Sequence, residues 1–220
     1  MKFASRRDAG RRLGQYLRER GVAADLVLGL PRGGVVVAAE VALVLNLPLD
    51  VLVVRKIGHP LYREFAVGAL AEPDVFILDE RCVSQIAVPL ARLETVVAEE
   101  TARLRDYRSR FHRPAAPVLN ARTVLLVDDG LATGATAMAA VLSARRQNAR
   151  RIIVAAPVGS TTAVGKLQQV ADQVVVPWGD PAFMAVGEYY EHFDQTADAE
   201  VVALLNRAAP RGGAGASSSN

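Results

Sequence analysis

The sequence is poor in cysteine, lysine and histidine, and it lacks long apolar runs. Cys82 is the only cysteine, so no intrachain disulfide can form and a reducing compartment is expected. The three histidines do not have the spacing of zinc ligands. No apolar run reaches the length of a membrane span, and the first residues lack the apolar core of a secretion signal. We therefore expect a cytoplasmic location and no membrane partner.

The charges are nearly balanced, and the positive ones are almost all arginine. Lys and Arg number 26 against 23 Asp and Glu, and only three of the cations are lysines: Lys2, Lys56 and Lys166. The arginines are scattered among acids, without the basic stripe and interleaved aromatic residues of a nucleic-acid-binding protein. Nucleic acid is therefore not an expected partner, whereas a phosphate-bearing small molecule would need only a few of these arginines.

Apolar strands alternate with helical patterns along most of the chain. Strands that are apolar throughout are typical of a parallel sheet whose two faces are both covered. The pattern predicts an α/β fold, with a doubly wound, mainly parallel sheet and helices on both faces. We expect helices over 6–20, 34–46, 134–147, 160–170 and 198–207, strands over 24–29, 49–55, 122–127, 151–157 and 173–177, and one or two short strands within 66–78.

A single domain is expected over 1–208, followed by a low-complexity, disordered tail at 209–220. The domain includes a helical insertion at 80–113, broken at Pro89, and a C-terminal segment at 177–208. Apolar residues recur at helical spacing in the insertion, which indicates a core stripe or a partner-facing seam. The arginines between them are expected to form its solvated face: Arg92, Arg103, Arg105, Arg108 and Arg110.

The most informative segment is 123–136, where an apolar strand ends at Asp128 and Asp129 and a loop of small and hydroxyl residues leads into a helical pattern. A strand that stops at such a loop before a helix brings free backbone N–H groups and the positive helix end together, which favours a phosphate. The hydroxyls of Thr133 and Thr136 add donors. A phosphorylated sugar fits this arrangement, with its hydroxyls or a hard cation on the acidic side.

An ordinary strand–turn–helix would also use Asp, Gly and Thr, as turn and capping residues. Two adjacent acids repel each other, however, and the fold alone gives no reason to keep both. Neither the Gly-Lys-Ser/Thr of a Walker A loop nor the G-x-G-x-x-G of a dinucleotide site follows the strand. The functional interpretation is therefore favoured.

A glycine-rich loop with Arg32, Gly33 and Gly34 follows the predicted strand 24–29. The glycines permit close approach of the backbone to an anion, and the guanidinium offers planar, charge-assisted donors. Glycine turns between a strand and a helix are common, so this loop alone would be a weak signal. Its value comes from occurring together with the acid pair.

Arg55 and Lys56 close the predicted strand 49–55. Cations at a strand end are usually solvated. Lysine is rare in this chain, however, so the presence of Lys56 is not explained by composition alone and favours a functional role. The basic pair, the glycine loop and the acid pair all lie at carboxyl ends of predicted parallel strands. Because α/β sheets bind ligands beyond those ends, we expect the three segments to converge on one site.

The segment from Val127 to Thr136 resembles the phosphoribosyl-pyrophosphate (PRPP) motif of the type I phosphoribosyltransferases, an apolar strand followed by two acids and a Thr-Gly-x-Thr loop. The resemblance implies that Asp128 and Asp129 hold the ribose hydroxyls. It implies that a loop wraps the 5′-phosphate, formed by Gly130, Leu131, Ala132, Thr133, Gly134, Ala135 and Thr136. The glycine loop resembles the family's pyrophosphate loop, and the basic pair stands where the family often contacts pyrophosphate: Arg32, Gly33, Gly34, Arg55 and Lys56.

The resemblance implies an enzyme that transfers the 5-phosphoribosyl group of PRPP to a nitrogenous base, as in nucleotide salvage, and releases pyrophosphate. Mg²⁺ is the implied cofactor, held mainly by PRPP and water, with no direct protein ligand required and with Asp128 and Asp129 as the only candidate side chains. The alternative is a non-catalytic regulator on the same fold that senses PRPP or a nucleotide, because a fold and a phosphate site do not establish turnover. The resemblance is also compatible with a homodimer.

Two further expectations concern the accepting base. Ala132 stands where enzymes for 6-oxopurines usually carry a third carboxylate, so the resemblance disfavours those bases and any general acid or base must come from elsewhere. The candidate is Glu64, within the segment 57–68 that we expect to be a lid with glycine hinges; a plain surface loop is the alternative. Trp178 is a candidate to stack on the base, in a hood built from the C-terminal segment.

Overall fold

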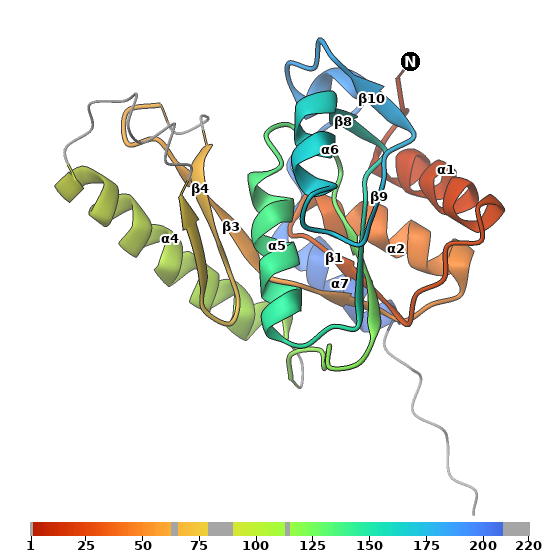
Figure 1. The fold of residues 1–220 in the computed structure, drawn as a ribbon, viewed down its shortest axis with the longest axis horizontal. Helices are drawn as coiled ribbons and strands as arrows, with labels where there is room; N and C mark the ends of the chain where they lie inside the picture. Colours follow the sequence, from red (N-terminus) through yellow and green to blue (C-terminus); the bar gives the residue numbers. More distant parts are fainter. Residues whose placement is uncertain (1, 63–65, 79–89, 113–114, 209–220) are drawn as a thin grey trace, which may run out of the picture.

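The computed structural model of this chain describes residues 2–62, 66–78, 90–112 and 115–208. Its largest sheet has five parallel strands in the order β2-β1-β6-β7-β9. This arrangement confirms the predicted parallel α/β sheet (Figure 1). The strands are β1 (Leu26–Gly29), β2 (Leu49–Val51), β6 (Thr123–Val127), β7 (Arg151–Ala155) and β9 (Gln173–Val175).

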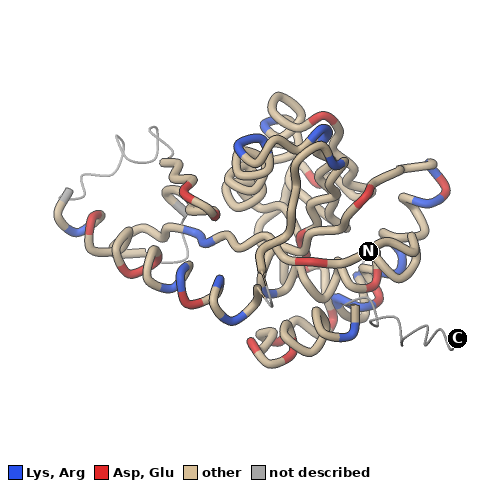
Figure 2. The backbone as a smooth tube through the Cα atoms, turned by 90° about the horizontal axis from the view of Figure 1, so that it is seen from below, with Lys and Arg blue, Asp and Glu red and all other residues tan. Residues whose placement is uncertain are grey.

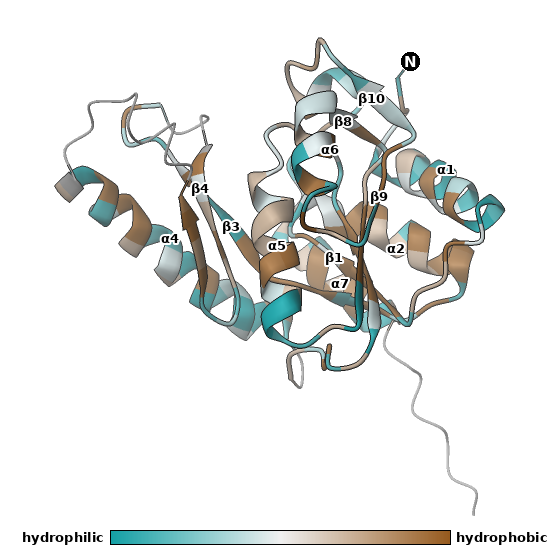
Figure 3. Cartoon of the chain, in the orientation of Figure 1, coloured by the Kyte–Doolittle hydropathy of each residue, from teal (hydrophilic) through white to brown (hydrophobic). Residues whose placement is uncertain are grey.

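Both faces of this sheet are buried, which explains why its strands are apolar throughout. All residues of β1 and β6 are buried. Along β6, Leu125 and Val127 enter one apolar cluster, while Val124 and Leu126 enter the other. A strand covered on both faces has no polar side to alternate with the apolar one. Figure 3 shows the hydrophobic residues gathered in the central strands and in the helix beside them.

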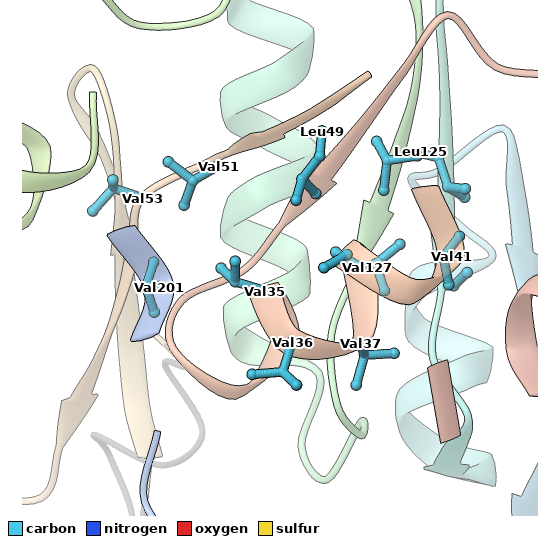
Figure 4. Packing of buried hydrophobic residues seen from close by; sticks show 14 of the residues in the cluster. Val35, Val36, Val37, Val41, Leu49, Val51, Val53, Leu125, Val127 and Val201 are labelled. Atoms are coloured by element: carbon cyan, nitrogen blue, oxygen red, sulfur yellow. The ribbon is translucent and has the colours of Figure 1, made fainter. Parts of the chain in front are cut away.

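Helices cover the two faces in separate groups. The first face carries α1 (Arg6–Glu19), α2 (Gly33–Leu45) and α7 (Asp198–Ala208), and the second carries α5 (Ala135–Arg146) and α6 (Thr161–Leu167). Figure 4 shows the packing on the first face, where Val35 and Val41 of α2 and Val201 of α7 lie with Val127 of β6. The helices on both faces confirm the doubly wound architecture.

A second sheet projects to one side of the main sheet, with a long helix packed along it (Figure 1). It is antiparallel and has three strands, β3 (Val54–Gly58), β4 (Ala66–Ala71) and β5 (Val75–Leu78). The helix is α4 (Leu90–Phe111), which lies in the predicted helical insertion. Residues of both charge signs are distributed along α4 (Figure 2).

The predicted continuous strand 49–55 is wrong, because the chain leaves the parallel sheet after Val51 and starts β3 at Val54. The Val53 N–H donates to the side chain of Glu72 at 2.7 Å, and its carbonyl accepts from the Glu72 N–H at 3.1 Å. Val53 therefore satisfies its backbone outside the parallel sheet. Leu52 and Val53 are nevertheless buried, so the apolar run gives no sign of the break.

Smaller elements near the C-terminal half were not predicted. Two three-residue strands, β8 (Val158–Ser160) and β10 (Trp178–Asp180), pair in parallel, and the 3-10 helix η1 (Val186–Tyr189) follows. Residues 80–89 and 113 of the predicted insertion and the predicted tail 209–220 lie outside the described residues.

Within the described residues, no helix combines the length and the apolar character needed to cross a membrane.

Candidate functional site

Asp128 and Asp129 follow β6, the central strand of the parallel sheet. The Arg6 Nε of α1 donates to Asp129 Oδ2 at 2.7 Å, and the Asp129 backbone N–H donates to Asp128 Oδ1 at 2.8 Å. Burial, and then the negative charge of Asp129, raises the pKa of Asp128 well above its usual range. The pair therefore holds one carboxylate compensated by an arginine and a second whose charge is unfavourable without a ligand, as is common at functional sites.

We expect Asp128→Asn to stabilise the fold at neutral pH. Because the folded-state pKa of Asp128 is raised, its charged form costs stability, and that cost appears as the pH rises through the raised pKa. A gain on the order of 1 kcal/mol corresponds to about 2–4 °C in Tm for a chain of this size. Thermal unfolding across pH should show the gain vanish in acid, below the ordinary aspartate pKa.

The control for this variant is Asp172→Asn. A hydrogen bond from Arg145 lowers the pKa of Asp172, so its charged form stabilises the fold, and this contribution is lost as the pH falls. The two variants should therefore shift Tm in opposite directions at neutral pH. A lower Tm for Asp128→Asn would contradict the unfavourable charge assigned to that residue.

The first turn of α2 packs directly against the acid pair. A Cβ atom on Gly33 would lie 2.1 Å from Asp129 Oδ2, and one on Gly34 would lie 2.8 Å from the Val127 carbonyl oxygen. Only glycine allows this approach. The Arg32 side chain instead turns to α7, where its Nη1 lies 3.3 Å from Asp198 Oδ1. The glycine loop and the acid pair are thus adjacent, although the Arg32 guanidinium is paired outside them.

Gly34→Ala should therefore lower the stability by about 1–3 kcal/mol, because the added methyl group meets backbone atoms that cannot move aside without moving β6. The matched control is Gly165→Ala in α6, where no atom lies within 4 Å of the added Cβ. That replacement should stabilise the protein by about 0.5–1 kcal/mol, since alanine has the better helix propensity. Chemical denaturation of both variants measures the difference, and equal midpoints would refute the close-packing explanation.

The loop from Gly130 to Thr136 connects β6 to α5 and is anchored at two places. Leu131 is buried and its N–H donates to the Val158 carbonyl of β8 at 3.0 Å. Gly134 has φ +80°, a left-handed conformation that favours glycine, and it caps the N-terminus of α5. Ala132 and Thr133 stay exposed between these anchors. The loop therefore presents its middle residues at the positive end of α5.

A cavity of about 310 Å³ is lined by the basic pair and by one residue from each of the two loops, but neither acid of the pair and none of Arg32, Gly33 and Gly34 lines it. Pro31 comes from the glycine loop and Thr136 from the loop after β6, while Arg55 and Lys56 come from β3. The prediction that the basic pair lies at the carboxyl end of a parallel strand is wrong, because β3 belongs to the antiparallel sheet. The lining also includes Val54 and Gly58 of β3 and Glu100 and Arg103 of α4.

Three residues at the site were not found from the sequence. Tyr190 donates its hydroxyl to the Asp129 carbonyl oxygen at 2.5 Å, and burial raises its pKa. Arg6 pairs with Asp129, and Glu100 lies at the cavity. The bonds of Arg6 and Tyr190 to Asp129 span 123 and 61 positions, and the bond from Arg55 to Glu100 spans 45. No local pattern signals them. Arg103 is exposed, as predicted, and it also lines the cavity.

The remaining candidates lie apart from the cavity or outside the described residues. Glu64 is outside them, so its predicted role stays a prediction. Trp178 lies on β10, opposite Val158 of β8, with 41% of its surface exposed, and it does not line the cavity. Gly68, expected as a hinge, pairs with Ile57 within the hairpin, where a Cβ would come within 2.4 Å of the Ile77 carbonyl oxygen. Close strand packing therefore explains this glycine.

The described residues contain no group of three or more His, Cys, Asp or Glu side chains arranged to hold a metal ion. The acid pair offers two carboxylates, and Arg6 already compensates one of them. This donor set fits an Mg²⁺ ion that takes most of its ligands from substrate oxygens and water, since Mg²⁺ commonly keeps several waters.

A parallel α/β sheet with helices on both faces, and with an acid pair and a glycine loop at one edge, is the arrangement of the phosphoribosyltransferase type. The chain belongs to this family: the model of the phosphoribosyl transferase domain matches residues 4–179. Among solved structures, the chain is similar to TT1426 from Thermus thermophilus, with 41% identity and a TM-score of 0.77. The similarity covers 96% of this chain and all of that one.

Curated relatives are longer than this chain. Two Mycobacterium tuberculosis proteins, from strains CDC 1551 / Oshkosh and ATCC 25618 / H37Rv, have names that assign them only provisionally to the phosphoribosyl transferases. Each is 44% identical to this chain over 207 residues, which cover 94% of this chain and 47% of the relative. The chain therefore spans about half the length of the curated relatives it matches.

Proposed function

We propose that the protein transfers the 5-phosphoribosyl group of PRPP to a nitrogenous base and releases pyrophosphate. The observation that carries this proposal is the packing of Gly33 and Gly34 against Asp128 and Asp129, beside a cavity lined by Lys56 and by Thr136. Acceptors for ribose hydroxyls near donors for phosphate groups are what a phosphoribosyl donor needs, and this supports the proposal. Membership of the phosphoribosyl transferase domain family supports the same reaction class.

In the proposed reaction the bond between the anomeric carbon and pyrophosphate breaks, and a bond from that carbon to a base nitrogen forms. The base gives up a proton as it attacks, and the proposed acceptor of that proton is the Glu64 carboxylate. The anomeric carbon becomes cation-like, and the negative charge of the acid pair stabilises it if the ribose hydroxyls are held there. Arg55 and Lys56 compensate the charge that grows on the departing pyrophosphate. Bound Mg²⁺, held by PRPP oxygens with Asp128 and Asp129 nearby, would neutralise part of that charge.

Base selection is expected to exclude 6-oxopurines. Ala132 lies exposed in the middle of the loop after β6, and its methyl group can neither accept nor donate a proton. We therefore propose that hypoxanthine, guanine and xanthine are poor acceptors. The proposed role of Trp178 is to stack on the base from the segment beyond β8.

Pyrophosphate release tests the proposal. The protein is incubated with PRPP, Mg²⁺ and one nucleobase at a time, and released pyrophosphate is followed with a coupled assay. Release that depends on one base supports transfer. Saturable PRPP binding without release for any nucleobase would contradict the proposed enzyme and favour the regulator. A chain that does not bind PRPP at all would contradict the enzyme and a PRPP-sensing regulator, and only a nucleotide-sensing regulator would remain.

A further inference from the structure

Glu100 of α4 is almost fully buried, at 5% exposure, and it holds two arginines at the cavity. Its Oε2 accepts from Arg55 Nε at 2.8 Å and from Arg55 Nη2 at 2.7 Å. Its Oε1 accepts from Arg103 Nη1 at 2.5 Å. The Tyr107 ring centroid lies 5.0 Å from the Arg55 guanidinium carbon. Arg55 is therefore fixed by a carboxylate along one edge and by an aromatic ring nearby.

A purely structural role would be to tie α4 to β3, and the bonds do join these elements. The position of Glu100 and its two arginines at the cavity indicates a role in ligand binding as well. Arg55, Lys56, Arg103 and Glu100 all line the cavity, so three positive charges face one negative charge there. A guanidinium has five N–H groups, and the bonds to Glu100 use two from Arg55 and one from Arg103. Donor capacity remains on both arginines for an anion in the cavity.

The ligand class follows from these donors. Two planar guanidiniums bonded to one carboxylate suit an anion with several oxygens in more than one direction, as in two linked phosphate groups. The cavity also contains Pro31 and Thr136, from the two loops beside the acid pair. An extended ligand can thus place its sugar phosphate at the loop after β6 and a diphosphate between β3 and α4.

We propose that Arg103 of α4 binds the diphosphate group of the ligand together with Arg55, and that Glu100 is the positioning residue that holds both guanidiniums in place. The identity of this ligand as PRPP rests on the proposed function. The diphosphate site itself rests on the cluster of Glu100, Arg55 and Arg103. The long helix thus contributes to the ligand site, and its arginines do not form only a solvated face.

Titration calorimetry with inorganic pyrophosphate and with ribose 5-phosphate, at fixed ionic strength, tests this site. Arg103→Met should weaken pyrophosphate binding about tenfold, because charge-assisted hydrogen bonds are lost. Binding of ribose 5-phosphate should not change. The matched control is Arg105→Met, which removes the same charge from an exposed position of the same helix that does not line the cavity. Equal pyrophosphate affinities for the two variants would overturn the assignment.

Glu100→Gln separates positioning from simple charge. The variant makes the cavity more positive, so charge alone predicts tighter pyrophosphate binding. If Glu100 positions Arg55 and Arg103, the loss of its charge should instead make pyrophosphate binding several-fold weaker. Tighter binding would overturn the positioning role. If Glu100→Gln does not fold, Arg103→Met against Arg105→Met decides the site.

The wild-type protein distinguishes failure of this site from failure of the proposed function. Wild type that binds PRPP, with no loss of pyrophosphate affinity in Arg103→Met, would overturn the role of α4 alone. Wild type that binds pyrophosphate, with the loss in Arg103→Met, but does not bind PRPP would support this anion site and contradict the proposed reaction. Wild type that binds none of these ligands would overturn both.

Discussion

Replacement of both Asp128 and Asp129 by asparagine should weaken PRPP binding by at least about 100-fold, because each lost charged acceptor for a ribose hydroxyl costs about 1.5–3 kcal/mol. The fold should remain, because the double variant removes a repulsion between adjacent acids and the unfavourable charge of Asp128. Asp129→Asn also gives up the charge that pairs with Arg6, which offsets part of that gain. Titration calorimetry measures the affinity, and thermal unfolding measures the stability.

The control for the double variant is Asp74→Asn combined with Asp106→Asn. These aspartates make exposed ion pairs with Arg146 and Arg110 and lie outside the cavity, so the control removes the same net charge from the surface. Its PRPP affinity should match that of wild type. If the Asp128 and Asp129 double variant also binds PRPP within a factor of two of wild type, the acid pair is not part of the ligand site.

Glu72→Ala should lower the free energy of unfolding by about 3–5 kcal/mol, as expected when a buried carboxylate is removed and its hydrogen-bond donors are left unpaired. Glu72 is 3% exposed and follows β4. Its Oε1 accepts from the Val53 N–H at 2.7 Å, and its Oε2 lies 2.6 Å from His112 Nε2 and 3.2 Å from Arg108 Nε. Alanine would remove the carboxylate shared by Arg108 of α4, by His112 just after α4 and by Val53 just before β3.

Two comparisons make the Glu72 result specific. Glu72→Gln keeps an oxygen that can accept from the Val53 N–H, so it should be less destabilising than alanine. Asp74→Asn changes an acid two positions away whose side chain is 75% exposed, and its effect should be near zero. Chemical denaturation gives all three values. A loss below about 1 kcal/mol for Glu72→Ala would contradict its role as the link between α4 and β3.

The segment from Val127 to Thr136 could be recognised from sequence because its parts are contiguous. The apolar strand, the two acids, the small and hydroxyl residues and the following helix each leave a local signal within ten residues. The same holds for β1 and the glycine loop before α2, where burial on both sides makes the strand apolar throughout. These signals were sufficient for the parallel sheet and for the two segments that follow β1 and β6.

The position of the basic pair could not be predicted, because the break between β2 and β3 carries no glycine or proline and both residues at it are buried. The Val53 N–H donates to the side chain of Glu72, nineteen positions away, so no local pattern signals this bond. The strands β8 and β10 have three residues each, too few for periodicity to reveal.

Arg103 was assigned to the solvated face of the helix because helical spacing separates apolar positions from polar ones. The spacing does not show which of the polar positions lies beside a cavity. Its partner Glu100 is buried only because β3 packs beside α4 in the folded chain. Arg6 and Tyr190 reach Asp129 across 123 and 61 positions. Such contacts depend on how α1 and the C-terminal segment close over the sheet edge, which a single sequence does not display.

The most direct test of the central claim is a crystal structure of the protein with PRPP and Mg²⁺. We expect the 5′-phosphate to lie within hydrogen-bond distance of backbone N–H groups in the loop 130–136, and the ribose hydroxyls to contact Asp128 and Asp129. A sugar phosphate bound at any other place, with this loop and the acid pair making no contact to it, would contradict the account.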